Sequence, residues 1–139
     1  MTDQKPILYP ITPEWFLTLN ENFQHRVEND QLVLWTTGKT IITVAFRLPD
    51  SLSNEDLLDS IKSRFSESKL EKFEVEDETL IRYAALQTED SATGKARLVL
   101  HGFTITQTSC LQSAFYFDLP ADLEWAKTTW QSIIYVPDL

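Results

Sequence analysis

Cys110 and His101 are the pair of side chains that could act as a thiolate nucleophile and its base, because the chain has one cysteine and two histidines. Both fall in alternating stretches that predict a β-hairpin about a turn at residues 107–108. Pairing about that turn places them on one face of the sheet, but four positions apart, about 13 Å at ~3.3 Å per residue. This separation exceeds hydrogen-bond reach, so we predict a buried and unreactive Cys110.

The Gly-Lys-Thr tripeptide at residues 38–40 resembles the end of a phosphate-binding P-loop. That motif also needs a glycine five residues earlier, where this chain has Val33. A P-loop joins a strand to a helix, so that backbone amides surround a phosphate, whereas residues 38–40 join two predicted strands. We therefore predict an ordinary hairpin turn here.

Metal-binding patterns are also incomplete. His25 and His101 lack the spacing of a helical metal pair, and two histidines cannot supply three imidazole ligands. The acidic run at residues 74–78 has neither the spacing nor the glycine of a calcium loop, and it predicts a solvated hairpin. We predict no catalytic residues, no metal and no cofactor, although paired carboxylates for hydrolysis cannot be identified or dismissed by spacing alone.

The overall charge points to a class of partner. Twelve Lys and Arg residues against 21 Asp and Glu give a net charge of −9, which repels nucleic acids and anionic lipid surfaces. A protein with a basic surface is the partner that this charge favours, and acidity for solubility alone is the alternative. We predict a cytoplasmic protein without a membrane span. The chain has one cysteine, its N-terminus lacks the apolar run of a signal peptide, and no stretch of ~20 apolar residues occurs in it.

The elements that position these residues follow from hydrophobic spacing. Alternation at residues 23–28, 31–36 and 40–48 predicts a three-stranded meander, with turns at Asn29-Asp30 and at Gly38. A capping signature and apolar residues at helical spacing predict a helix over residues 53–65.

The second half of the chain repeats this order with a longer meander. Strands are predicted near residues 73–75 and 80–83, a polar loop at 88–94, and a long hairpin from residues 95–106 and 110–118. Large apolar residues occupy both faces of that hairpin, which predicts cover on both sides. The cover is expected from the helix at 53–65 and from a closing helix at 123–134.

These elements predict one α+β domain over residues 1–139: a single antiparallel sheet of six or seven strands with helices packed on its faces, an α/β/α sandwich. Residues 1–10 show no periodicity and are expected to be irregular. The sequence Thr12-Pro13-Glu14 resembles a helix start, and it predicts a short helical turn that carries Trp15, Phe16 and Leu19.

Three residues near the closing helix are candidates for partner binding. Trp125 and Tyr135 fall off the apolar stripe of that helix, and Glu124 adds an acidic group beside Trp125. An exposed aromatic residue on an acidic helix can anchor an interface. The alternative for Trp125 is a place at the edge of the core.

The element order resembles that of the PsbP-like superfamily, which includes the extrinsic oxygen-evolving protein of photosystem II and the Ran-binding nuclear-import factor of yeast. The resemblance rests on the strand at residues 40–48 that runs into the helix at 53–65, and on the hairpin at 101–118 that runs into the helix at 123–134. It spans roughly residues 15–135 by pattern, and no family binding motif aligns residue by residue. It implies a sheet layered between helices and a role in binding.

The chain also resembles class I type III secretion chaperones in its small size and its acidity. Those proteins bind unfolded effector segments as dimers. The seven strands predicted here are more than that fold is expected to use.

Three functional hypotheses follow. The first is a non-catalytic protein-binding or adaptor module whose acidic surface meets a basic partner. The second is a small-ligand-binding protein or enzyme with a pocket between the sheet and a helix, lined by Trp, Tyr and a polar group such as His101. The third is a secretion-chaperone-like dimer. The sequence identifies no partner and leaves the oligomeric state open.

Overall fold

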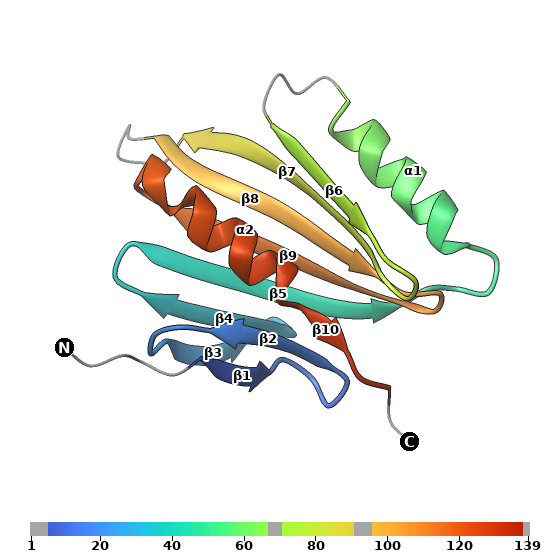
Figure 1. Cartoon of the computed structure of the whole chain (residues 1–139), viewed down its shortest axis with the longest axis horizontal. Coiled ribbons are helices and arrows are strands. Elements are labelled where there is room, and N and C mark those ends of the chain that lie inside the picture. Colours follow the sequence, from blue (N-terminus) through green and yellow to red (C-terminus); the bar gives the residue numbers. More distant parts are fainter. Residues whose placement is uncertain (1–5, 67–70, 91–95, 138–139) are drawn as a thin grey trace.

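The computed structural model describes residues 6–66, 71–90 and 96–137, which form two antiparallel sheets and two α-helices (Figure 1). The larger sheet has the order β3-β4-β5-β9-β8-β7-β6, and the smaller has the order β1-β2-β10. The seven strands of the larger sheet are β3 (Gln24–Glu28), β4 (Gln31–Thr36), β5 (Lys39–Arg47), β6 (Lys72–Glu76), β7 (Ile81–Asp90), β8 (Ala96–Ile105) and β9 (Ser109–Phe117). The remaining elements are β1 (Ile7–Pro10), β2 (Trp15–Leu19), β10 (Ile134–Tyr135), α1 (Asn54–Arg64), the 3₁₀ turn η1 (Pro120–Asp122) and α2 (Leu123–Gln131).

The predicted order of three strands, a helix, four strands and a closing helix is confirmed for the larger sheet and its two helices. The turn between β3 and β4 has positive φ at both Asn29 (52°) and Asp30 (64°), as a tight two-residue hairpin requires. Gly38, with φ of 78°, lies in the turn between β4 and β5, and Lys39 and Thr40 begin β5, so the tripeptide belongs to a β-hairpin. A capping box between Ser53 and Asp56 starts α1.

The long hairpin has the register that the alternation predicted. Ile105 pairs with Cys110, and His101 pairs with Ala114. The turn is held by the Thr106 hydroxyl, which accepts hydrogen bonds from the backbone N–H groups of Thr108 (3.1 Å) and Ser109 (2.8 Å). β7 runs on through Asp90, so the first residues of the predicted polar loop at 88–94 belong to this strand, and residues 91–95 lie outside the described part.

The predicted helical turn at residues 12–19 is wrong, because Trp15–Leu19 form the strand β2 and residues 12–14 form a turn before it. The Thr12 hydroxyl accepts hydrogen bonds from the backbone of Glu14 and Trp15, both at 3.1 Å, and so closes a turn instead of capping a helix. Trp15, Leu17 and Leu19 are buried and alternate with half-buried neighbours. That period of two is the spacing of a strand.

Two further expectations at the chain ends are wrong. Residues 7–10 are not irregular, because they form β1 and pair with β2. The closing helix ends at Gln131, and Ile134 and Tyr135 leave it to pair with Phe16 and Trp15 of β2 as strand β10. The first and last described segments of the chain therefore meet in the smaller sheet.

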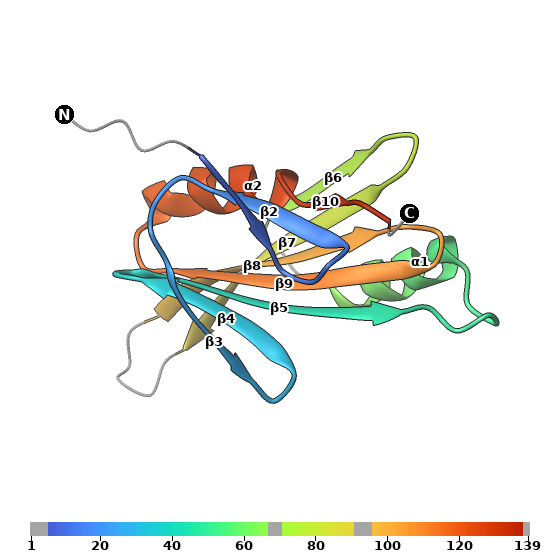
Figure 2. The same cartoon turned by 90° about the horizontal axis from the view of Figure 1, so that it is seen from below.

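The single-sheet α/β/α sandwich is also corrected by this arrangement. One face of the larger sheet is covered jointly by α2 and the smaller sheet, which enclose the main core (Figure 2). Trp15, Leu17 and Trp130 are among its fully buried side chains. The other face carries α1, whose Leu57, Ile61 and Phe65 pack on one part of the sheet in a second cluster.

Candidate functional site

Cys110 and His101, the pair considered as a thiolate nucleophile and its base, lie too far apart to act together. Cys110 is fully buried among apolar side chains, and burial raises the pKa of its thiol to about 12. His101 is half-buried, packs its ring 5.6 Å from that of Phe65, and has its pKa lowered by burial. The register keeps the two residues four positions apart, so no thiolate and base can form.

The thiol is therefore expected to be inert in the folded protein. At about pH 8 an exposed cysteine reacts readily with a thiol reagent, because a useful fraction is thiolate. Cys110 should react only when the protein unfolds, at a rate that follows global unfolding. Measurement of labelling with and without denaturant, using a free thiol as the control, checks this. Rapid native labelling would show that the sheet opens at Cys110.

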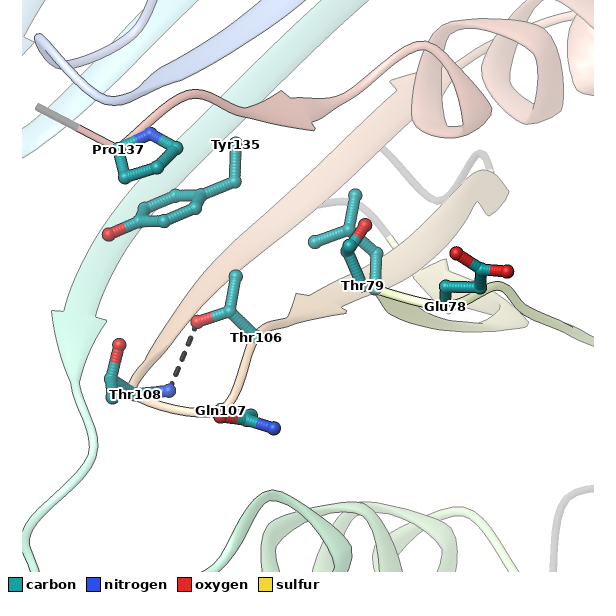
Figure 3. Close-up of a pocket in the computed structure, with 8 residues that line it drawn as sticks. Glu78, Thr79, Thr106, Gln107, Thr108, Tyr135 and Pro137 are labelled. Carbon is teal, nitrogen blue, oxygen red and sulfur yellow. Dashed lines mark hydrogen bonds between the residues drawn. The ribbon is translucent and has the colours of Figure 1, made fainter. Parts of the chain in front are cut away.

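A pocket of about 450 Å³ lies at one end of the larger sheet, between two hairpin turns and the segment that follows α2 (Figure 3). The β6–β7 turn contributes Glu78 and Thr79, and the β8–β9 turn contributes the stretch 106–108. Tyr135 of β10 forms the wall opposite these turns. A carboxylate, several hydroxyls, an amide and an aromatic ring therefore line one opening, with Glu78 and Tyr135 on opposite sides of it.

A buried arginine, Arg82, holds the β6–β7 turn in place. Arg82 is 8% exposed, and its guanidinium donates hydrogen bonds to Asp77 Oδ2 (2.9 Å) and to the backbone carbonyl of Ile133 (2.9 Å). Asp77 also accepts hydrogen bonds from the backbone N–H groups of Thr79 (2.9 Å) and Leu80 (2.8 Å). These contacts fix the β6–β7 turn against the segment after α2.

Stability should fall in acid because of Asp77. The Thr79 backbone N–H, then the Leu80 backbone N–H and the Arg82 guanidinium, hold the pKa of Asp77 well below its usual value of 3.8. A depressed folded-state pKa stabilises the protein above the unfolded value, and that contribution is lost as the pH falls toward the folded one. We expect the urea midpoint to drop below about pH 4 and the Asp77→Asn variant to lose part of this dependence. An identical pH profile for the two proteins would contradict the assignment.

Acidic side chains are frequent in two neighbouring parts of the chain, α1 with the loop before it, and β6 with the turn after it. We call this surface the acidic flank and define it as residues 50–66 and 71–78. It carries nine Asp and Glu against three Lys and Arg. Lys62 Nζ of α1 contacts Glu74 Oε1 of β6 at 2.6 Å, and the β6–β7 turn lies farther from α1, on the α2 side of the larger sheet (Figure 2).

Sequence reasoning missed this convergence. It treated residues 74–78 as a solvated hairpin on their own, because nothing in the spacing indicates that β6 lies against α1. A count of charge along the chain shows that nine of the 21 acidic residues fall within these two segments, but not how the segments lie in space. The pocket gives no comparable signal, because it forms only where two distant turns meet.

The three residues predicted for partner binding are not brought together. Trp125 is half-buried and belongs to the edge of the core. The centre of its ring lies 6.0 Å from that of Phe115 and 5.1 Å from the Lys39 ammonium. Glu124 is exposed beside it. Tyr135 lies beyond the far end of α2, where its hydroxyl donates to Glu14 Oε2 (2.6 Å) and its ring lines the pocket. Partner binding by these residues stays a prediction.

The described residues contain neither a metal-binding cluster nor a membrane-spanning helix. In the described ranges, no three His, Cys, Asp or Glu side chains lie close enough together to hold a metal ion. Neither α1 nor α2 is long and apolar enough to cross a bilayer, and no other α-helix occurs in the part of the chain that the structure covers.

No family model matches this chain, and no curated protein matches it. Among solved structures, the fold is similar to a crystal structure of a protein from Bacteroides thetaiotaomicron VPI-5482, with a TM-score of 0.73 and 10% sequence identity. The similarity covers 99% of this chain and 50% of that one, so the chain spans half the length of its neighbour. At this identity the likeness shows a shared fold alone.

Proposed function

We propose that this chain is a non-catalytic protein-binding or adaptor module whose acidic flank meets a basic surface on another protein. The observation that carries the proposal is the charge imbalance of that flank, which contains nine acidic residues and three basic ones. An excess of one sign on one side of a protein steers an oppositely charged partner and selects its orientation.

The exposure of the flank supports this role. β6 is an edge strand of the larger sheet, and all its side chains except the half-buried Phe73 are exposed. Asp59 and Glu55 are exposed on α1. Exposed carboxylates attract an oppositely charged partner from a distance, and a contact that leaves them at its solvated rim keeps most of their hydration.

The pocket extends this surface. Glu78 belongs both to the acidic flank and to the pocket, and Tyr135 presents a ring across the opening. A carboxylate and an aromatic ring together suit a Lys or Arg side chain, through an ion pair and a cation–π contact. In this proposal a basic side chain of the partner enters the pocket while the rest of its surface lies along α1 and β6.

Charge reversal on the flank is the test. The protein would be used to capture a stoichiometric partner from a native lysate, and the affinity of the purified pair would then be measured by calorimetry. We expect the double variant Asp59→Lys/Glu76→Lys to bind about tenfold or more weakly, since rim charges of this kind steer and orient a partner. Binding of the unaltered protein should weaken between about 50 and about 500 mM NaCl, because salt screens exposed charges.

The matched control is Glu28→Lys/Glu89→Lys, which makes the same change in net charge at exposed positions outside the flank. The control should reduce affinity much less than the flank variant. Equal losses would show that only the net charge matters. A partner whose binding is unaffected by salt and by both variants would contradict the proposal.

A second candidate function is small-ligand binding, which the pocket of about 450 Å³ favours. Its place differs from the expected one between sheet and helix, since it opens at the end of the sheet. A thermal-shift screen of polar metabolites should find a stabilising compound if this function is right. Loss of that shift in Tyr135→Ala would assign it to the pocket, and the absence of any stabilising compound would count against the candidate.

Two broader expectations also stay proposals. Membership of the PsbP-like superfamily is supported by the order of three strands, a helix, four strands and a helix around the larger sheet. Location in the cytoplasm is supported by the single cysteine, which is free and buried. A sequence profile built from homologues, and microscopy of the tagged full-length protein, are the respective tests.

A further inference from the structure

A second cavity lies on the face of the larger sheet that carries α1, and we call it the sheet-face cavity. The strand register puts Ile42 of β5, Ala114 of β9 and His101 of β8 side by side across this face. Along β9 the same face carries Gln112 and Tyr116, two positions before and after Ala114. The short side chain of Ala114 therefore lies among four larger ones and leaves a cavity of about 260 Å³.

The helix α1 borders this cavity without closing it. It packs on residues of β7, β8 and the start of β9, and the ring of its neighbour Phe65 lies 5.6 Å from that of His101. Figure 2 shows the β3–β4 hairpin bent away from α2, toward the side that carries the cavity. Val33 and Val99 lie on the part of this face beyond α1 and are nevertheless buried. This part of the sheet is therefore sheltered although no helix covers it.

The lining of the sheet-face cavity combines an apolar floor with a polar rim. Ile42, Val44 and Ala114 supply the apolar groups. The polar side chains are two amides, an imidazole and a phenol, from Gln31, Gln112, His101 and Tyr116. Among the described residues, none with an ordinarily charged side chain lines the cavity. A few hydrogen-bonding groups around an apolar surface are typical of small-ligand sites.

The polar rim is uncharged at neutral pH. Burial lowers the pKa of His101 below its usual value and raises the pKa of the Tyr116 phenol. Arg97, whose guanidinium lies 5.3 Å from the centre of the Tyr116 ring, has its charge matched by Asp118 at 3.3 Å. A charged ligand would therefore give up hydration here without meeting an unpaired opposite charge.

Each group on the rim can both donate and accept a hydrogen bond, since an amide, a neutral imidazole and a phenol hydroxyl all have this double capacity. Within the described residues, the side-chain hydrogen bonds donated along the β8–β9 hairpin come from Thr106, Ser109 and Ser113. No other described residue therefore occupies the donors and acceptors of His101 or Gln112. Ligand hydroxyls share the double capacity, whereas a carboxylate only accepts and an ammonium only donates.

We propose that the sheet-face cavity binds a neutral sugar ring, either a free monosaccharide or the end residue of a glycan. A sugar ring has an apolar face of C–H groups surrounded by hydroxyls, which matches an apolar floor surrounded by hydrogen-bonding groups. A cavity of about 260 Å³ equals about nine water volumes at ~30 Å³ each, close to the size of one hexose ring. The described lining residues all lie outside the acidic flank, so this site goes beyond the proposed partner binding and is tested separately from it.

Titration of the isotope-labelled full chain with methyl glycosides of glucose, galactose, mannose and N-acetylglucosamine, followed by NMR, tests this proposal. A ligand of about a dozen non-hydrogen atoms binds weakly, so we expect a Kd on the order of 1 mM for at least one glycoside. The shifted signals should come from β5, β8 and β9 around Ala114. Glucuronate and glucosamine, which are charged, should bind more weakly by about fivefold or more.

The source of the sugar is identified by a second experiment with immobilised glycans. Binding to glycans that end in the preferred sugar would identify a glycan end, and binding to the free glycosides alone would identify a monosaccharide.

Two variants and a matched control assign the binding to the cavity. Ala114→Leu should weaken binding by about tenfold or more, because the longer side chain fills the cavity. Gln112→Ala removes one group of the rim and should weaken binding by about threefold or more. Ala96→Leu makes the first change at an exposed position of β8 outside the cavity, and it should bind as the unaltered protein does.

Thermal unfolding would show that each variant is folded, and Gln112→Ala keeps the test usable if Ala114→Leu is not. The proposal would be overturned if no neutral glycoside shifted signals at up to about 50 mM, if neither variant weakened binding, or if a charged analogue bound as well as the neutral sugars. Shifts confined to residues 78–80 and 106–108 would place binding in the other pocket and would also overturn it. Tighter binding of acetyl-alanine amide, a peptide-like ligand of similar size, would do the same.

Discussion

Replacing Trp130 by alanine is expected to lower the free energy of unfolding by about 3–5 kcal/mol, the usual cost of truncating a large buried aromatic side chain. Trp130 is fully buried in the main core, between α2 and the larger sheet. Its removal takes apolar area out of the core and leaves a cavity where the smaller sheet and α2 close over the strands. Urea denaturation followed by circular dichroism measures the change.

Trp125→Ala is the control, because it removes the same side chain from the same helix. Trp125 is only half-buried at the edge of the core, so its loss should cost clearly less than that of Trp130. Equal losses would mean that the two tryptophans contribute alike and that the main core is not centred where α2 meets the sheet.

Gly102→Ala is expected to destabilise the protein by about 1–3 kcal/mol, and a larger side chain by more. A Cβ atom at this position would lie 2.6 Å from Trp130 Cδ1 and 2.7 Å from Ser113 Oγ. Both neighbours are buried, so neither can move without disturbing the core. Urea midpoints of the single and double variants provide the measurement.

Partial rescue would identify the cause. Ser113→Ala removes one of the two close contacts, so the double variant Gly102→Ala/Ser113→Ala should be more stable than the sum of the single effects predicts. Strict additivity would show that the contact with Ser113 contributes nothing, and that the cost of Gly102→Ala arises at Trp130 or in the backbone of β8.

Much of the larger sheet could be predicted because its signals are local. The turn residues Asn29, Asp30 and Gly38 need positive φ, and the alternation on each side of them then sets the register. The same reasoning placed His101 and Cys110 four positions apart, as the structure has them. The capping box of α1 is equally local.

The smaller sheet could not be predicted in this way, because its partners are far apart in the sequence. β10 pairs with Trp15 and Phe16, more than a hundred residues earlier. The apolar residues near Ile134 continue the spacing of α2, so the pattern extended the helix past its end. At Thr12 a hydroxyl that binds nearby backbone amides suits a turn and a helix cap equally well.

The candidate site was the least predictable part. Among the three residues chosen from the sequence, Tyr135 lines the pocket, whereas Trp125 and Glu124 lie at the other end of α2. Glu78 acquires its place in the pocket only because the tips of two hairpins lie at the same end of the sheet. Charge composition pointed to a basic partner, but the fold is needed to say which face carries the acids.

The central claim, that the acidic flank is the partner-binding surface, is tested most directly by hydrogen–deuterium exchange on the captured complex. We predict that binding slows exchange in α1, β6 and the β6–β7 turn, and leaves β1 and β2 unchanged. Protection confined to β1, β2 and β10, with α1 and β6 exchanging as in the free protein, would contradict it.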